Sequence, residues 1–385
     1  MIESIYIKNF KSILEDEVKL PRLGAIVGVN AAGKTNLIQA ISLIKDLVIG
    51  DSLEVATRKI TLTPQELFNF HNQSSNEMSL RIKVKNGDDT SYSLEIVIAL
   101  KIDDRGFPKL SITSEQFTRI KDDLQEIIYQ RSENNLKRGS GDPIPLAIDA
   151  DKLAVNLYKE SDVESFKAIM SKVAIPETDV MNFRESIVDQ GQGGLASLLV
   201  RLRHKTEPGN FELFQKVIKK LLVSFSSVVE ISAPQTQETT TEVGDENKLY
   251  IVLLEEKNLK GTLSMKSVSA GDLKTLYLIA NIINMKSGST FITEEIENGL
   301  HPKRLKDVIG HLDEIARQKN IQLLFTTHNP DVINTLRPSE VLSVKKEENQ
   351  GSHYQILSES RDITQIEKLL KEGGQLASFI NLEKQ

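Results

Sequence analysis

The chain has 385 residues, which is enough for one large α/β domain with an insertion or for two or three average domains. It contains no cysteine, so disulfides and thiolate metal sites are excluded, and its formal net charge of −6 excludes a global attraction to nucleic acid. No segment approaches the roughly 20 apolar residues of a membrane span, and Met1–Tyr6 lacks the basic head and apolar core of a signal peptide. We therefore expect a cytoplasmic protein with no membrane partner.

The N-terminal part is predicted to combine short strands with one helix. Apolar segments at 2–8 and 18–27 are typical of strands, and the second leads into a glycine-rich stretch. Behind that stretch apolar residues recur at helical spacing, which predicts an amphipathic helix over 34–49. Apolar and polar residues then alternate on both sides of Asn86-Gly87, so we expect an antiparallel hairpin there, followed by a third strand near 110–113.

From about residue 120 the pattern changes to helical segments separated by loops, and we interpret 120–225 as a helical insertion. Residues 235–247 are polar and rich in Thr and Glu, which predicts a mobile loop. Strands and helices then alternate again, as expected for a mainly parallel sheet flanked by helices, so the predicted fold class is α/β. The predicted helices of these regions lie at 121–130, 150–172, 195–204, 211–223, 272–285 and 303–318, and the later strands at 249–254, 261–265, 289–294 and 321–327.

The glycine-rich stretch is a complete phosphate-binding loop. Gly28-Val29-Asn30-Ala31-Ala32-Gly33-Lys34-Thr35 fits the pattern G-x-x-x-x-G-K-[ST] and lies between a predicted strand and a predicted helix. Glycines let backbone N–H groups wrap a phosphate, and the positive end of the helix faces the anion. Lys34 would bridge the β- and γ-phosphates, and the Thr35 hydroxyl would bind Mg²⁺. The expected ligands are therefore a nucleoside triphosphate and Mg²⁺.

Two adjacent carboxylates, Glu294 and Glu295, follow the apolar pair Phe291-Ile292. Hydrolysis of a nucleotide needs one acid to hold Mg²⁺ and a second acid to orient or deprotonate the attacking water. Side chains alternate along a strand, so neighbouring positions at a strand end can serve both roles. The alternative is a solvated acidic turn, and the motifs that follow favour the catalytic interpretation.

Three further segments could serve the same nucleotide. Ser269-Ala270-Gly271-Asp272 begins a predicted helix and offers a hydroxyl and N–H groups, either as a phosphate site or as a simple N-cap. Asn298-Gly299-Leu300-His301-Pro302 follows the acidic pair as a strand-to-helix turn. His328 ends a buried strand and is either a structural side chain or a hydrogen-bond donor to a γ-phosphate.

The order of these motifs resembles that of the ABC-class ATPase heads of the SMC, RecF and OLD (overcoming lysogenisation defect) families. The opening Ile7-Lys8-Asn9-Phe10-Lys11-Ser12 is also similar to theirs, as is Glu294-Glu295-Ile296-Glu297-Asn298-Gly299-Leu300-His301-Pro302. The likeness covers roughly 1–115 and 225–345, with Gly193–Leu202, and is closest to the compact OLD-like ATPases of bacterial phage-defence systems.

The resemblance implies an ABC-type P-loop ATPase fold with an antiparallel β subdomain. It divides the chain into an ATPase lobe with the phosphate loop, a helical insertion, a second ATPase lobe and a C-terminal segment. The second lobe carries the signature motif, the acidic pair and the switch histidine. The four parts are expected at 1–119, 120–225, 226–345 and 346–385.

The resemblance also implies a role for each residue. Glu294 stands at the position of the Mg²⁺-directed Walker B acid, Glu295 at that of the hydrolytic glutamate, and His328 at that of the switch histidine. Ser269-Ala270-Gly271 corresponds to the signature motif, which acts in trans on the ATP of a second head, so a homodimer or a higher even-numbered oligomer is expected. Lys11 corresponds to a basic residue that faces the nucleotide. The residues expected to bind ATP are Gly28, Asn30, Ala31, Ala32, Gly33, Lys34, Thr35, Asn36, Ser269 and Gly271; those expected to bind Mg²⁺ are Thr35 and Glu294; and the catalytic residues are Lys34, Glu295 and His328.

The sequence departs from the family pattern in several places. Glu294 replaces the usual Asp, Ile296 replaces the usual Pro, and Asp272 stands where the signature usually has Gln. The segment after His328 is too short for the Toprim nuclease domain of OLD nucleases, and 120–225 lacks the sustained heptads of an SMC coiled coil. Phosphate loop and signature lie farther apart than in transporter ATPases. The glutamine that completes the Mg²⁺ shell stays open among Gln65, Gln73, Gln116 and Gln125.

These features favour an ATPase that dimerises on ATP and controls a separately encoded effector, a nuclease or a toxin, in phage defence. A RecF- or SMC-like ATPase of DNA repair or recombination is the first alternative. Basic clusters at 201–205, 216–220 and 303–306 are either solvated helix faces or a surface for DNA or RNA. A scaffold that binds ATP without hydrolysing it is the second alternative, because the change at Glu294 alters the reach of the acid.

Overall fold

The computed structural model describes residues 1–69, 75–87, 89–133, 135–146, 148–176, 187–188, 194–204, 206–222, 225–232, 250–256, 260–347 and 350–380. The chain forms two compact units. Unit 1 consists of Met1–Ile175, Gly288–Glu294 and Ile321–Gln385, and unit 2 of Pro176–Ser287 and Glu295–Asn320. The loop predicted at 235–247 and the candidate Gln73 lie outside the described residues.

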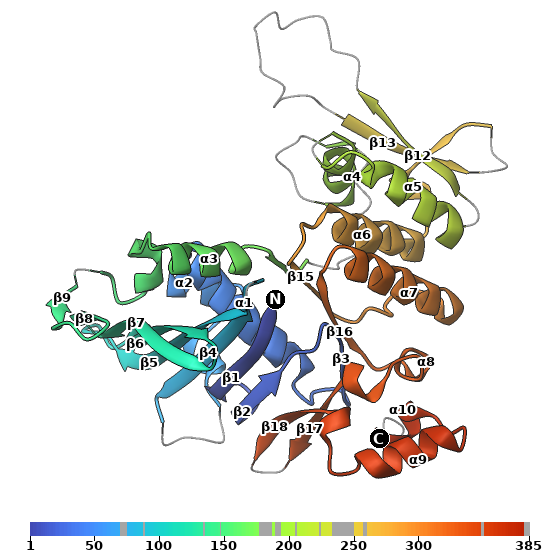
Figure 1. The fold of residues 1–385 in the computed structure, drawn as a ribbon. Helices are drawn as coiled ribbons and strands as arrows, with labels where there is room; N and C mark the ends of the chain where they lie inside the picture. The colour runs from blue at the N-terminus through green and yellow to red at the C-terminus, as the bar shows by residue number, and fades with distance from the viewer. Residues whose placement is uncertain are drawn as a thin grey trace, which may run out of the picture. The chain divides into compact units, whose positions relative to one another are not determined.

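Unit 1 is built on one large mixed sheet (Figure 1). In their order across the sheet, its strands are β10 (Val173–Ala174), β15 (Thr290–Thr293), β16 (Gln322–Thr327), β3 (Leu23–Val27), β17 (Val341–Glu347), β18 (Gly351–Ile356), β2 (Ile13–Lys19), β1 (Ile2–Phe10), β4 (Glu77–Lys85), β5 (Thr90–Ile102), β6 (Pro108–Lys121), β7 (Leu124–Ser132), β8 (Asn135–Arg138) and β9 (Ile144–Pro145). The five strands from β10 to β17 are parallel to one another. From β17 onward neighbouring strands are antiparallel, as in the β4–β5 hairpin predicted around Asn86-Gly87.

The predicted α/β class is confirmed by this architecture. Every residue of β3 and of β16 is buried, as expected for parallel strands that are covered on both faces. The side chains of β4 are buried at every second position, which matches the alternating pattern of the sequence. The antiparallel strands, expected as a separate subdomain, continue the same sheet as the parallel ones.

Helix α1 (Lys34–Ile49) has the bounds that the sequence predicts and packs beside β1 and β4 (Figure 1). Its buried residues include Leu37, Ile41 and Ile44, so an apolar face fixes the helix on the sheet. It ends where Gly50 takes a left-handed conformation with φ 115°. The other helices of unit 1 are α2 (Leu53–Arg58), α3 (Ser161–Met170), α8 (Pro330–Ile333), α9 (Ile363–Lys371) and α10 (Leu376–Phe379), with a 3₁₀ turn, η2, at Ala154–Leu157.

In its described residues, unit 2 packs four helices with a small antiparallel sheet. Its elements are α4 (Leu195–His204), α5 (Asn210–Leu221), α6 (Ala270–Asn284), α7 (Pro302–Gln318), β11 (Ile187–Val188), β12 (Phe225–Ser232), β13 (Tyr250–Glu256) and β14 (Thr262–Ser264). Helix α6 is central, because it packs against α4, α5 and α7 (Figure 1). Its side chains are buried on most sides, including Leu273, Leu276 and Ile279.

Several predicted elements need correction. Residues 121–130 are mainly strand β7 and not a helix: Leu124, Ile127 and Ile128 have helical spacing, but pairing with β6 along the whole strand overrides it. The expected helical insertion at 120–225 therefore begins with strands and becomes helical only from α3 onward.

The strand predicted at 18–27 is two strands, β2 and β3, because Pro21 between them has no N–H group to donate to a sheet. The helix predicted at 150–172 is confined to α3 and the short η2 turn. The β17–β18 hairpin was not predicted at all.

Candidate active site

The phosphate loop connects the end of β3 to the start of α1. Ala31 and Gly33 have positive φ angles of 60° and 112°, so the backbone turns sharply in front of the helix. Gly33 is the N-cap of α1, no side chain caps the helix, and no acidic residue lies in its first turn. No acidic side chain in the first turn therefore neutralises the positive end of α1. This end of the helix can bind a phosphate.

Residues of the β17–β18 hairpin and of the turn after β1 pack against this loop and form hydrogen bonds around it. The Tyr354 hydroxyl donates a hydrogen bond of 2.7 Å to the Gly33 carbonyl oxygen. The Ser12 and Ser352 hydroxyls lie 2.6 Å apart, and Asn36 Nδ2 donates to Ser12 Oγ over the same distance. A Cβ atom at Gly33 would lie 2.5 Å from Ser352 Oγ, so the close approach requires glycine.

Lys34 lies over the loop that precedes it. Its half-buried Nζ donates to the carbonyl oxygens of Gly28, at 2.7 Å, and Val29, at 3.0 Å. Gly28 is pressed against β17, because a Cβ atom there would lie 2.5 Å from the Val344 carbonyl oxygen. Thr35 follows with an exposed side chain. The two side chains predicted to bind phosphate and Mg²⁺ thus belong to the first turn of one helix.

The Asn9–Ser12 segment forms the turn between β1 and β2. Asn9 and Lys11 both have positive φ angles, 57° and 49°. Lys11 Nζ donates 2.6 Å to Gln39 Oε1 on α1, and burial lowers the pKa of Lys11. Because Gln39 is four residues after Thr35 on the helix, Lys11 lies beside the helix that carries the phosphate loop.

The carboxyl ends of β15, β16 and β3 meet at one edge of the sheet. Thr327 is paired with Val27, and β15 runs parallel to β16 on the other side. Neighbouring strands are about 4.8 Å apart, so Glu294, His328 and the loop that begins at Gly28 follow three adjacent strand ends. Open α/β sheets bind their ligands beyond the carboxyl ends of parallel strands.

The polar side chains at these strand ends differ in how far they are exposed to solvent. Glu294 is half-buried and His328 is exposed. Thr293, directly before Glu294, has a buried hydroxyl with no hydrogen-bond partner in the described part of the chain. An unsatisfied buried hydroxyl is unfavourable by about 1–3 kcal/mol, which marks a place where water or a ligand can bind. The phosphate loop, Thr35 and Glu294 therefore fit a nucleotide with Mg²⁺.

In unit 2, Ser269 is the N-cap of α6. Its Oγ accepts a hydrogen bond of 3.1 Å from the Asp272 main-chain N–H and donates one of 2.7 Å to Asp272 Oδ2. The carboxylate of Asp272 also forms an ion pair with Arg304 on α7. The N-cap interpretation is thus realised, and the side chain of Ser269 stays exposed.

The start of α6 packs closely on the turn after the acidic pair. A Cβ atom at Gly271 would lie 2.3 Å from the Gly299 carbonyl oxygen, so the two backbones touch. Glu295 has a φ angle of 44°, in the left-handed region that non-glycine residues seldom adopt, which is unfavourable by about 1–2 kcal/mol. Its exposed carboxylate accepts a hydrogen bond from Asn298 Nδ2.

Lys274 of α6 also reaches this turn. Its side chain is 1% exposed, and its Nζ donates a hydrogen bond of 2.8 Å to the Glu295 carbonyl oxygen. Burial lowers the pKa of Lys274 to about 8, against the opposing charges of Glu297 and Glu295. A hydrogen bond from a charged donor contributes about 1.5–3 kcal/mol. This bond recovers part of the unfavourable desolvation of the ammonium group, and it holds the Glu295 carbonyl oxygen in place.

The predicted site residues therefore fall into two groups. Lys34, Thr35, Glu294 and His328 gather at one sheet edge in unit 1, whereas Ser269, Gly271 and Glu295 gather around α6 in unit 2. Of the described glutamine candidates, Gln65 and Gln125 are exposed, and Gln116 pairs with Gln130 across β6 and β7.

Sequence reasoning missed five residues that support the site: Ser12, Ser352 and Tyr354 behind the phosphate loop, and Lys274 and Arg304 beside the signature. The hairpin residues carry no sequence signal, because no motif marks β18. Lys274 had a sequence signal, because it is a charged residue in a helix whose apolar positions include Leu273, Leu276 and Ile279. A lysine at such a position must find a partner.

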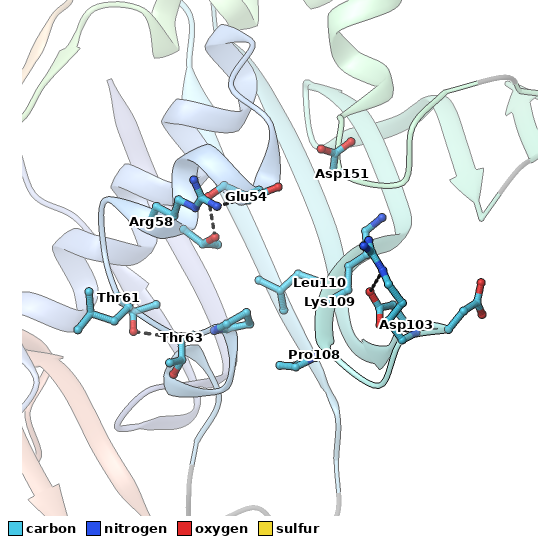
Figure 2. Close-up of a pocket in the computed structure, with 14 residues that line it drawn as sticks. Glu54, Arg58, Thr61, Thr63, Asp103, Pro108, Lys109, Leu110 and Asp151 are labelled. Carbon is cyan, nitrogen blue, oxygen red and sulfur yellow. Dashed lines mark hydrogen bonds and ion pairs between the residues drawn. The ribbon is translucent and has the colours of Figure 1, made fainter.

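A separate pocket of about 610 Å³ in unit 1 contains none of the motif residues. It lies between α2 with the turn after it and the β5–β6 hairpin (Figure 2). Arg58 pairs with Glu54 and Arg105 with Asp103 in its wall. Acidic and basic side chains both line the pocket, which also includes Asp104, Lys109 and Asp151, and we assign it no ligand.

Comparisons with known proteins agree with this geometry. The sequence matches the family model described as "AAA domain, putative AbiEii toxin, Type IV TA system" over residues 25–334. No curated protein sequence matches the chain. In the described part of the chain, no helix combines the length and the apolarity that a membrane span requires.

Two solved structures share the fold. A crystal structure of the Smc head bound to the C-winged helix domain of ScpA is 15% identical, with a TM-score of 0.58, and the match covers 94% of this chain and 99% of that chain. A Smc head domain with an extended coiled coil, bound to the C-terminal domain of ScpA derived from Pyrococcus furiosus, is 13% identical, with a TM-score of 0.53 and coverage of 96% and 98%. The chain thus has the fold of an SMC-type ABC ATPase head, and by the match over residues 25–334 it belongs to this AAA-domain family.

Proposed function

We propose that the protein binds ATP with Mg²⁺ and hydrolyses it slowly, as an ABC-class ATPase that dimerises on ATP. The main support is the sheet edge of unit 1, where the phosphate loop, Glu294 and His328 follow the ends of three adjacent parallel strands. Family membership is the second support, because the fold is that of ATPase heads.

In this proposal the residues from Gly28 to Asn36 hold the triphosphate. Lys34 Nζ exchanges its two loop carbonyl partners for phosphate oxygens, which is favourable because a phosphate carries full negative charge. Thr35 and Glu294 hold Mg²⁺, and the bound ion neutralises charge that develops on the phosphates. Glu295 orients the attacking water, and His328 contacts the γ-phosphate.

Glu295 belongs to unit 2 but is covalently joined to Glu294, the last residue of this part of unit 1. The two acidic residues are neighbours in the chain, with Cα atoms about 3.8 Å apart. Ser269, Thr35, Glu295 and His328 are all exposed. A catalytic site needs to exclude water, which supports the proposal that a second copy covers these residues and contributes Ser269 and Gly271 in trans.

The test is phosphate release by three purified variants beside the wild type. Lys34→Ala should lose ATP binding and hydrolysis, and Glu295→Gln should keep binding but lose hydrolysis by a factor of about 100 or more. Lys45→Ala, on the same helix but away from the loop, should match the wild type. If wild-type release does not exceed that of Lys34→Ala, the chain is not a hydrolase, and the scaffold alternative replaces this proposal.

The wider role that we propose is control of a separately encoded effector, a nuclease or toxin, in phage defence. The DNA repair alternative has one supporting observation, the exposed cations Arg201, Lys216 and Lys219 on α4 and α5. The third basic cluster supports it less, because Arg304 is engaged with Asp272. Stimulation of hydrolysis by duplex DNA without any partner protein, lost on charge reversal at Arg201 and Arg203, would favour the repair role.

A further inference from the structure

We propose that Lys274 is a positioning residue for hydrolysis, which fixes the backbone of Glu295 and so ties the hydrolytic carboxylate to the signature helix of the same chain. The inference rests on the proposed function, because it concerns the glutamate assigned there to the attacking water. Lys274 itself touches neither nucleotide nor water in this account.

The first support is the geometry of the Glu295 carbonyl. Two donors converge on this one oxygen: Lys274 Nζ at 2.8 Å and the Asn298 main-chain N–H at 3.0 Å. A carbonyl oxygen has two lone pairs, so its acceptor capacity is fully used. These bonds hold Glu295 at a φ angle of 44°, a conformation that its own side chain does not favour.

The second support is the unfavourable desolvation of the Lys274 ammonium group. Its side chain is 1% exposed, and Leu273 and Leu276 on the same helix are fully buried. A buried ammonium group needs a strong partner, and the bond to the Glu295 carbonyl supplies it. The side chain therefore has one stable place to lie, which makes it a rigid link and not a fluctuating surface contact.

The third support is the number of links between the start of α6 and the turn after the acidic pair. Gly271 is in backbone contact with Gly299, and Asp272 is paired with Arg304. Together with Lys274 these contacts join both ends of the turn to one helix. The start of α6 and the backbone of Glu295 are therefore held together at several points.

The experiment compares Lys274→Met with Lys319→Met. Lys319 is a matched control, because its Nζ also donates to a backbone carbonyl, that of Ile283, and burial also lowers its pKa. Lys319 lies just after α7, away from the signature and the acidic pair. For both variants we would measure the Kd for ATP, the kcat of phosphate release and the melting temperature.

We expect Lys274→Met to lower kcat by about 100-fold with the Kd for ATP changed less than about twofold, because a small misplacement of a catalytic group costs rate and not ground-state binding. Lys319→Met should leave kcat within about twofold. A kcat of Lys274→Met equal to that of Lys319→Met would overturn the inference.

Two further comparisons cover a failure of Lys274→Met to fold and a failure of the proposed function itself. If Lys274→Met does not fold, Lys274→Gln against Lys319→Gln serves the same purpose, because glutamine is shorter and cannot restore the bond in place. Glu295→Gln is measured in parallel. Full hydrolysis by Glu295→Gln would refute the proposed function itself, whereas an inactive Glu295→Gln with a normal Lys274→Met would refute only the role of Lys274.

Discussion

Two glycines at the ends of α1 share a backbone conformation but differ in their surroundings. Gly33 and Gly50 have φ angles of 112° and 115°. A Cβ atom at Gly33 would lie 2.5 Å from Ser352 Oγ and 2.8 Å from Ser12 Oγ, whereas one at Gly50 would meet nothing within 4 Å. Replacing each glycine by alanine therefore distinguishes two effects. Both variants carry the strain of a left-handed alanine, and only the variant at Gly33 also disturbs the packing behind the phosphate loop.

Gly50→Ala should lower the free energy of unfolding by about 1–2 kcal/mol, the strain of a left-handed alanine. Gly33→Ala should lower it by a further 1–3 kcal/mol or so, because the methyl group displaces two serines. Only Gly33→Ala should weaken ATP binding. Urea unfolding and titration with a fluorescent ATP analogue measure both effects. Equal values for the two variants would mean that the hairpin does not hold the loop.

Lys274 gives the protein a defined pH dependence. Its pKa is about 8 in the folded chain, while an exposed lysine titrates near 10.5. Between these pH values the unfolded state binds more protons than the folded state, so the free energy of unfolding rises with pH. The full effect is at most about 3 kcal/mol.

We compare the free energy of unfolding of the wild type with that of Lys274→Met. The difference, wild type minus variant, should rise by about 1–2 kcal/mol when the pH is raised from 8 to 9.5. Using the difference between the two proteins removes the titration of all other groups. Urea denaturation at both pH values measures it. A difference that does not change with pH would show that the ammonium of Lys274 titrates as it does in water.

At the scale of elements, a buried polar network joins β6, β7 and the η2 turn. The carboxylate of Glu115 is fully buried and accepts hydrogen bonds from the Tyr129 hydroxyl at 2.5 Å and from the main-chain N–H groups of Ala154 and Val155 at 2.6 and 2.8 Å. Arg131, which is 1% exposed, lies 3.9 Å from the same carboxylate. Burial raises the pKa of Glu115, and these contacts oppose the rise.

Removing one hydroxyl from this network should be more harmful than removing one at the surface. Tyr129→Phe should lower the free energy of unfolding by about 1–3 kcal/mol, because it deprives a buried carboxylate of a donor. Tyr6→Phe removes a comparable bond to Glu15 in an exposed place and should lower it by less than about 1 kcal/mol. Equal losses in chemical denaturation would count against the network as a stabilising feature.

Elements with a local signal were predictable from the sequence. The loop from Gly28 to Thr35 with its helix, and the hairpin around Asn86-Gly87, are set by glycines and by periodicity within one segment. Strand β7 was mistaken for a helix because its partner β6 decides its structure, and the β17–β18 hairpin carries no motif. The contacts behind the phosphate loop join residues more than 300 positions apart, such as Gly33 and Tyr354, and no local pattern reveals them.

For the whole molecule, the chain passes between the two units at four places, and one of them is the bond between Glu294 and Glu295. The residues that would bind the nucleotide belong to unit 1, and those that a second copy would use belong to unit 2. The four-part division of the chain at 119, 225 and 345 stays a prediction.

The most direct test of the account is the molar mass of Glu295→Gln, measured by light scattering during size exclusion with and without ATP and Mg²⁺. The variant binds ATP but does not hydrolyse it in this account, so it should run as a dimer with ATP and as a monomer without nucleotide. Glu295→Gln combined with Ser269→Arg should stay monomeric in both conditions, because the exposed signature serine would be blocked. A monomeric Glu295→Gln at saturating ATP and Mg²⁺, or a dimer that Ser269→Arg does not disturb, would contradict the shared nucleotide site.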